Sequence, residues 1–242
     1  MKIAISGTYS TGKTTTTLAL SYLTGISKTH AKTMREILPV AFPGKRLEEC
    51  LPNELMELGI RRFFERCEAE CQYNNHFVSD GCAIQEWIYG TARLKHGLNP
   101  NEHMLKVGWK KMMDPTGYKV FEKTMEAFGL IAKQYVKENY DVIVHLPIEF
   151  AFTPDGHRPV KEKFRSESEK ILLDTYLEWN IKPLIVTGKL EQRLQRIVEA
   201  LKLPQQMSIK EAVESAIRDK VSLFDSVKLE TTEVLENQIQ TS

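Results

Sequence analysis

The chain has 242 residues, of which 42% are hydrophobic and 27% are charged, and its formal net charge is +1. This length fits one α/β domain with additions, or at most two small domains, and the composition is ordinary for a globular protein. The near-zero net charge argues against a polyanion as the main partner, because such proteins usually carry a basic excess.

The N-terminal sequence MKIAISG turns polar too early for a signal peptide. No stretch approaches the ~20 apolar residues that span a bilayer, so no membrane partner is expected. The four cysteines form no C-x-x-C pair, which favours reduced thiols over a metal site. We therefore expect a cytoplasmic protein.

The first half of the chain alternates short apolar runs with segments of helical periodicity. In chain order we expect a strand over Lys2–Ser6, a helix over Lys13–Leu23, a strand around Ser27–Ala31, one or two helices over Leu47–Asn74 with a boundary near Pro52, a brief strand over Phe77–Ser79 and a helix over Ile84–Leu94.

The second half begins with an insertion at about 96–118 that is rich in glycine and proline and is expected to be irregular. There follow an expected helix over Val120–Glu138, a strand over Val142–Leu146, an irregular basic segment over Phe152–Arg165, a helix over Ser166–Asn180, a strand over Lys182–Val186, and helices over Leu190–Leu201 and Ile209–Phe224.

Short apolar strands separated by long helices predict a mainly parallel sheet with helices on both faces, a three-layer α/β/α sandwich. We expect the main domain to cover residues 1–203 and a C-terminal helical extension to cover 204–242. Ligands of such folds bind at the carboxyl ends of the strands.

A glycine loop follows the first expected strand directly. Its sequence, GTYSTGKT, fits G-x-x-x-x-G-K-[ST] at every fixed position, with a strand before it and a helix after it. Its backbone N–H groups and the helix N-terminus would hold phosphates, the lysine would reach the β- and γ-phosphates, and the last threonine would bind Mg²⁺. The contacts are expected from Gly7, Ser10, Thr11, Gly12, Lys13, Thr14 and Thr15.

Asp80 follows the strand Phe77–Ser79. A carboxylate at this position can hold Mg²⁺ or accept a proton from an attacking hydroxyl. The residue pattern does not separate these two roles, and Asp80 could instead cap the following helix.

Two further segments are candidates for the substrate side. A basic lid at about 152–168 would bring Arg158 and Arg165 to a transferring phosphoryl group; the alternative is a solvated basic loop. Arg35 and Glu36, after the second expected strand, are either substrate contacts or a surface pair.

Together these motifs resemble the P-loop family that includes the ribosylnicotinamide kinase domain of NadR-type proteins, which is often grouped with AAA-domain ATPases. The resemblance covers about Met1–Leu201 and includes Met34-Arg35-Glu36, Asp155-Gly156-His157-Arg158 and Val186-Thr187-Gly188 with Glu191 and Arg193. It implies that Arg158 is the lid arginine and that Thr187 and Gly188 lie against the purine. Many relatives carry Arg after the strand-end acid, where this chain has Gly81, and no adenylyltransferase module of full-length NadR proteins is present.

The leading hypothesis is an ATP- and Mg²⁺-dependent kinase that acts on a hydroxyl of a small nucleoside- or nucleotide-like acceptor. In this hypothesis Lys13 and Thr14 hold the phosphates and metal, Asp80 receives the proton, and Arg158 and Arg165 cover the transferring group. A regulatory ATPase or GTPase switch is the first alternative, although the chain has no N-K-x-D. A kinase for a hydroxyl in modified nucleic acid is the second. The helices Val120–Glu138 and Ile209–Phe224 could form a homodimer face or could simply pack on the sheet.

Overall fold

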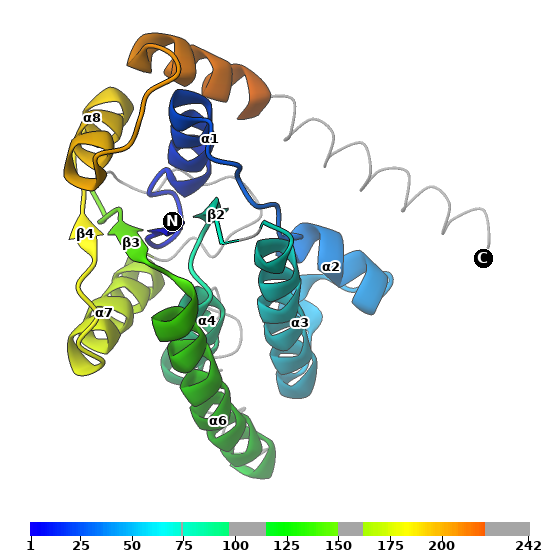
Figure 1. The fold of residues 1–242 in the computed structure, drawn as a ribbon. Helices are drawn as coiled ribbons and strands as arrows, with labels where there is room; N and C mark the ends of the chain where they lie inside the picture. Colours follow the sequence, from blue (N-terminus) through cyan, green and yellow to red (C-terminus); the bar gives the residue numbers. More distant parts are fainter. Residues whose placement is uncertain (74, 97–114, 150–161, 221–242) are drawn as a thin grey trace, which may run out of the picture.

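A parallel four-stranded sheet lies at the centre of the computed structural model, which describes residues 1–73, 75–96, 115–149 and 162–220 (Figure 1). The strands follow one another in the order β2-β1-β3-β4. Because β1 has a partner on each side and apolar residues on both faces, it is the centre of the core. The strand bounds are β1 Lys2–Ser6, β2 Phe77–Asp80, β3 Val142–His145 and β4 Leu184–Ile185.

Helices connect the strands and account for most of the described residues. Their bounds are α1 Lys13–Thr24, α2 Met34–Ala41, the 3₁₀ helix η1 Leu47–Glu49, α3 Pro52–Cys71, α4 Ile84–His96, α6 Pro115–Asn139, α7 Glu162–Glu178, α8 Leu190–Leu201, and a last helix described over 209–220.

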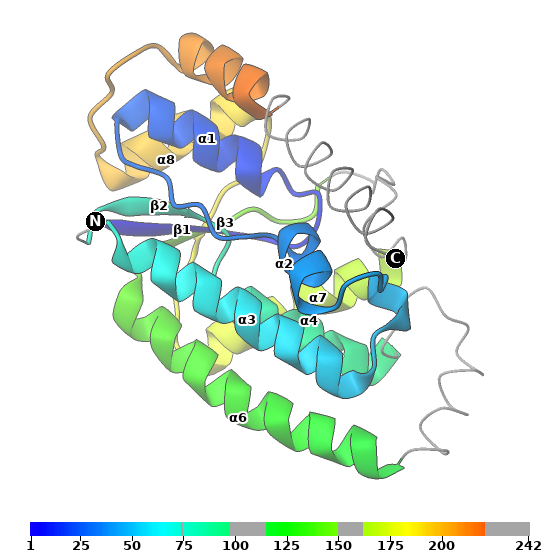
Figure 2. The ribbon, with the colours of Figure 1, turned by 90° about the vertical axis from the view of Figure 1, so that its right-hand side faces the viewer.

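The helices cover both faces of the sheet (Figure 2). On one face α1, α8 and helix 209–220 form a core with Ile3 and Ile5 of β1. On the other face α4, α6 and α7 form a second core with Ala4. The side chains of β1 alternate between the two cores because successive strand residues point to opposite faces. The predicted three-layer α/β/α sandwich is therefore confirmed.

The expected strand at Ser27–Ala31 is wrong. The chain pairs there with β2 through a single bridge, Lys28 to Val78, flanked by backbone hydrogen bonds from Val78 to Ser27 and from Thr29 to Val78. After Thr29 the chain leaves the sheet, and α2 begins at Met34. We did not expect α2, although Thr33 and Glu36 carry its signal: the Thr33 N–H donates to the Glu36 carboxylate at 2.6 Å, as in a capping box.

The expected irregular insertion at 96–118 is wrong at its C-terminal end. Helix α6 begins at Pro115, and proline is favoured in the first turn of a helix because its missing N–H has no partner to lose there. The apolar face of α6 packs on α3 and α4 within the chain, so the stripe that suggested a dimer face is used in the core. Residues 97–114 lie outside the described part.

The ends of the expected lid and of the C-terminal extension also differ from the structure. Helix α7 begins at Glu162, so residues 162–168 are helical rather than part of an irregular lid. In helix 209–220, Ala212, Val213 and Ala216 pack into the same core as β1, and the rest of the expected helix lies outside the described residues. No helix of the described ranges is long and apolar enough to cross a bilayer.

Candidate functional site

The glycine loop connects β1 to α1 at the carboxyl end of the central strand. Gly7 and Gly12 have φ values of 143° and 92°, which side chains rarely adopt. A Cβ at Gly7 would lie 2.5 Å from the Leu146 carbonyl oxygen, and one at Gly12 would lie 3.0 Å from Nη1 of Arg193. Both fixed glycines of the motif are thus required by backbone conformation and by close neighbours.

Two buried arginines hold the loop from outside. Arg193 of α8 donates from Nη1 to the Thr11 carbonyl at 2.6 Å, and Arg165 of α7 donates from Nε to the Tyr9 carbonyl at 2.9 Å. Their exposed fractions are 4% and 2%. Both loop carbonyls are thus held by arginine side chains that come from other helices. Arg165 therefore anchors the loop, and its expected place in an irregular lid is wrong because it lies on α7.

The side chains of the loop are ordered by contacts within it. Lys13 donates from Nζ to the Thr8 carbonyl at 2.7 Å, and Thr11 donates from Oγ1 to the same carbonyl at 3.1 Å. Thr14 and Thr15 lie in the first turn of α1, at the positive end of its dipole. Ser10 has a φ of 56°, within the left-handed region. The ammonium of Lys13 is thus held inside the loop, at the Thr8 carbonyl.

The turn after β4 is tied to the loop by a partly buried ion pair. Gly188 donates its N–H to both oxygens of Glu149 at 2.8 and 3.0 Å, and Glu149 pairs with Arg193 at 2.6 Å. Burial opposes the charge on Glu149, but the bonds from Arg193 and Gly188 outweigh it and lower its pKa. Arg196 donates to the carbonyl and hydroxyl oxygens of Thr187. Thr187 and Gly188 are thereby positioned relative to the phosphate loop.

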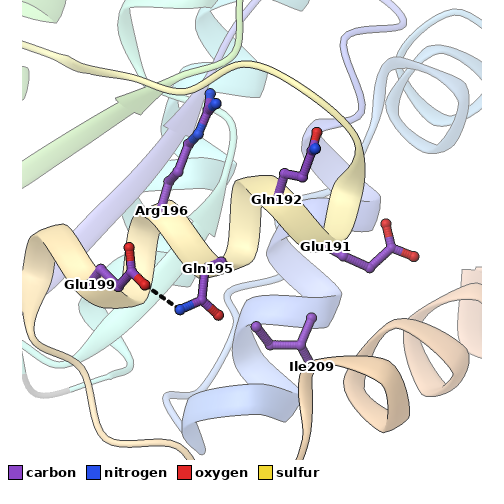
Figure 3. A pocket seen from close by; sticks show the side chains of 6 residues that line it. All are labelled: Glu191, Gln192, Gln195, Arg196, Glu199 and Ile209. Atoms are coloured by element: carbon purple, nitrogen blue, oxygen red, sulfur yellow. Dashed lines mark hydrogen bonds between the residues drawn. The ribbon is translucent and has the colours of Figure 1, made fainter.

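A groove of about 450 Å³ lies on the exposed side of α8, close to this turn (Figure 3). Most of the residues that line it are polar in type, and they include the hydrogen-bonded pair of Gln195 and Glu199. It is lined by Glu191, Gln192, Gln195, Arg196, Glu199 and Ile209. The groove contains no residue of the glycine loop, so it is separate from the phosphate site.

A second cavity, of about 360 Å³, opens beside Lys13 and Thr14 and extends away from them between α1 and helices α2, α3, α4 and α6. Asp80 lines it near the loop because β2 pairs in register with β1, which places Asp80 beside Ile5. The other lining residues used below are Leu47, Leu55, Gly59, Arg62, Arg66, Gly81, Glu86, Phe121 and Met125.

A buried cluster of two arginines and one glutamate forms a wall of this cavity. Arg62 and Arg66 of α3 both pair with Glu86 of α4, at 3.0 and 3.3 Å. Burial opposes the charge on Glu86, but the two arginines outweigh it and lower its pKa. Arg66 also donates from Nη1 to the Asp80 carbonyl at 2.9 Å. The guanidinium of Arg66 thus fixes the backbone of the strand-end acid.

Gly81 is the residue that lets Arg66 reach this position. Its φ is +110°, and a Cβ there would lie 2.8 Å from Nη2 of Arg66. The guanidinium therefore occupies the space that a side chain at position 81 would need.

We expect Gly81→Ala to lower the free energy of unfolding clearly more than Gly44→Ala does. Urea denaturation of the two variants measures this difference. Gly44 has a φ of +75° and open space around its Cβ, so Ala there costs only the backbone strain of about 1–2 kcal/mol. At Gly81 the collision with Arg66 adds an overpacking cost of about 1–3 kcal/mol. Equal losses in the two variants would show that Arg66 does not pack tightly on Gly81.

A second buried carboxylate supports the segment that carries Asp80. Glu70 of α3 accepts hydrogen bonds from Ser79, Tyr135 and Tyr140 at 2.5, 2.9 and 2.8 Å. The hydroxyl of Tyr140 also accepts from the N–H of Ala83 at 3.1 Å. These bonds hold the chain on both sides of Asp80, so the position of the acid depends on α3 and α6.

Of the predicted residues Glu36, Arg35 and Arg158, the structure describes the side chain of Glu36 alone. Glu36 lines the cavity and pairs with His30 at 3.7 Å; its pKa is lowered to about 2, chiefly by the hydrogen bond with His30. Arg35 lies in the first turn of α2, but its side chain is outside the described part, as is Arg158.

Sequence reasoning missed the roles of Arg66, Glu86 and Arg193 in this site. Arg62 and Arg66 are four residues apart in a helix and hence share a face, which is a visible signal. Their partner Glu86 lies on another helix, and nothing in the sequence pairs it with them. The groups that could hold a metal here are the Thr14 hydroxyl and the Asp80 carboxylate. Within the described ranges no cluster of three or more His, Cys, Asp or Glu side chains forms a metal site.

Comparison with known proteins gives a family match and a likeness to solved structures. A family model described as an AAA domain matches residues 2–193, from β1 into the first turn of α8. A comparison with curated proteins finds no match for the chain. Among solved structures, deoxyadenosine kinase from M. mycoides, bound to the products dCMP and dCDP, is similar with a TM-score of 0.49 and 14% identity, over 92% of this chain and 100% of that chain.

Proposed function

This chain belongs to the AAA-domain family, and on that premise we propose that it is a kinase that transfers the γ-phosphoryl group of ATP to a hydroxyl of a nucleoside- or nucleotide-like small molecule. The observation that carries the proposal is the cavity of about 360 Å³ that begins at Lys13, Thr14 and Asp80 and extends away from them. It offers a second substrate a place directly beside the triphosphate, which a kinase needs and a nucleotide switch does not.

In the proposed reaction the acceptor oxygen attacks the γ-phosphorus while its O–H proton passes to the Asp80 carboxylate. The bond from the γ-phosphorus to the bridging oxygen breaks, and ADP leaves with that electron pair. Lys13 and the loop N–H groups hold the phosphates and neutralise their charge. Arg66 acts through Asp80, because its bond to the Asp80 carbonyl keeps the acid next to the loop.

Mg²⁺ is the metal that these residues fit. Thr14 and Asp80 line the same cavity and offer oxygen ligands, and Mg²⁺ typically takes one or two protein carboxylates together with phosphate oxygens rather than an all-protein cage. When bound, the ion would neutralise charge on the β- and γ-phosphates.

The remaining roles follow from the resemblance to NadR-type kinases and stay proposals. Arg158 would cover the transferring group, and Thr187 and Gly188 would lie against the purine of ATP. Glu36 and Arg35 would contact the acceptor, since Glu36 lines the cavity. Arg165 would act through the backbone of Tyr9, to which it donates.

An assay of ADP release with ATP and Mg²⁺ tests the function against a panel of nucleosides, pyridine nucleosides, nucleoside monophosphates and other small alcohols. We expect one class of acceptor to stimulate ADP release and to yield a product heavier by one phosphoryl group in mass spectrometry. Slow hydrolysis that no acceptor stimulates, together with tight nucleotide binding, would contradict the small-molecule kinase. It would favour a nucleotide switch or a macromolecular acceptor, such as modified nucleic acid.

A further inference from the structure

One face of α3 forms a continuous wall of the cavity. Leu55, Gly59, Arg62 and Arg66 follow one another at helical spacing, and all four line it. At one end of this face Arg66 contacts the Asp80 carbonyl. From Arg66 to Gly59 the helix rises by about 10 Å, at about 1.5 Å per residue. The position of a residue on this face of α3 therefore indicates how far it lies from Asp80.

Gly59 is the unusual residue on this face, because neither the backbone nor the packing requires a glycine. It lies inside a 20-residue helix, where glycine costs about 0.5–1 kcal/mol relative to alanine, and it is not among the glycines with positive φ. A Cβ built on Gly59 meets no heavy atom of the described residues within 4 Å.

Two other helical glycines show the contrast. A Cβ at Gly90 would collide with the Sδ atom of Met125, and one at Gly129 would lie 2.6 Å from Nε1 of Trp87. Close packing between helices explains both of these glycines. Because no atom of the described residues lies within 4 Å of a Cβ at Gly59, and Gly59 lines the cavity, the space that its missing side chain leaves belongs to the cavity.

Much of the lining that accompanies Gly59 is apolar, although Arg93 of α4 also lines the cavity and lies near Cys50, which packs with Leu55. Leu55 precedes it by one turn on the same face of α3, and Leu55 packs with Leu47 of η1. Phe121 and Met125 of α6 line the same cavity. By contrast, the charged lining residues of α3, Arg62 and Arg66, lie on the side of Gly59 toward Asp80. The wall of α3 thus changes from charged to apolar with distance from the acid.

We propose that Gly59 leaves room for the ring of the acceptor, and that the acceptor is an amphipathic alcohol about 10 Å long. Its reacting hydroxyl would lie at Asp80 and its apolar, ring-sized group over Gly59 and Leu55. This inference rests on the proposed kinase function and adds to it the place of the acceptor's ring, over Gly59 and Leu55, and the residue that leaves room for it. Polyols without a ring would leave the apolar end unfilled.

Gly59→Leu and Gly59→Ala test the inference, with adenosine, cytidine and nicotinamide riboside as acceptors that carry a base and ribose as the ligand that lacks the base. In Gly59→Leu we expect the KM of the acceptor that carries a base to rise by about tenfold or more, since the leucine fills the space over Leu55. The KM for ATP and any activity with ribose should be unchanged. Gly59→Ala should raise Tm by about 1–3 °C, through better helix propensity, with a smaller change in KM.

The outcomes separate this inference from the kinase proposal. If Gly59→Leu folds with at least the wild-type Tm and keeps the wild-type KM for the acceptor that carries a base, the inference is overturned while the kinase stands. If the wild type transfers no phosphoryl group to any acceptor, the kinase proposal fails, and titration calorimetry with the same nucleosides decides the inference. Binding that Gly59→Leu weakens by about tenfold supports the ring site, and no binding of any nucleoside overturns it.

Discussion

Lys13→Ala is expected to abolish phosphoryl transfer, with turnover lower by about 10³-fold and weaker binding of ATP. The ammonium is the one cationic side chain of the glycine loop, and its bond to the Thr8 carbonyl shows that it reaches across that loop. Charge-assisted bonds to phosphate oxygens strengthen as charge moves in the transition state, and losing one such donor typically costs about 10²–10³-fold. Steady-state ADP release and ATP titration calorimetry measure the two effects.

The matched control is Lys170→Ala, which removes a lysine whose side chain is 65% exposed on α7 and pairs with Asp174. It should leave turnover and Tm close to wild type, because exposed ion pairs contribute little. Unchanged transfer by Lys13→Ala would contradict the phosphate-loop assignment, and with it the proposed function as a whole.

Asp80→Asn is expected to lower turnover by about 10²–10⁴-fold, the usual contribution of a general base, while ATP affinity changes little. The amide keeps the size of the carboxylate but cannot accept the proton. The contact from Arg66 is to the Asp80 carbonyl, so it survives the substitution, and the backbone should keep its position. The surface variant Asp174→Asn, at a side chain that is 61% exposed, is the control.

A titration with Mg²⁺ separates the two roles open to Asp80. A base predicts the same half-saturating Mg²⁺ concentration in Asp80→Asn and wild type, whereas a metal ligand predicts a clear increase. Turnover within about threefold of wild type would exclude the general-base role.

The alternation of apolar strands and long helices was enough to predict the fold class, because buried parallel strands and amphipathic helices leave strong patterns. Helix α8 was predicted with the bounds that the structure has, Leu190–Leu201. The errors fall where a local signal was weak or overlooked. The run Ser27–Ala31 has strand character but only one bridge. The starts of α2 and α6 were signalled by Thr33 with Glu36 and by Pro115, which we did not use.

For the candidate site, the sequence by itself determined the glycine loop, since its spacing encodes a backbone conformation that local residues alone produce. It also predicted an acid at the end of β2, and the parallel pairing of β1 with β2 brings Asp80 beside that loop. The nucleotide, metal and acceptor roles of these residues remain predictions.

Only the tertiary structure decided what surrounds the loop and the acid. Arg193 and Arg165 reach the loop carbonyls from α8 and α7, more than 150 residues later in the chain. The guanidinium of Arg66, which comes from α3, occupies the space that a side chain at position 81 would need. Gly59 of α3 lines a cavity whose other walls include α4 and α6. Such contacts depend on helix packing angles and side-chain directions, which hydrophobic periodicity does not encode.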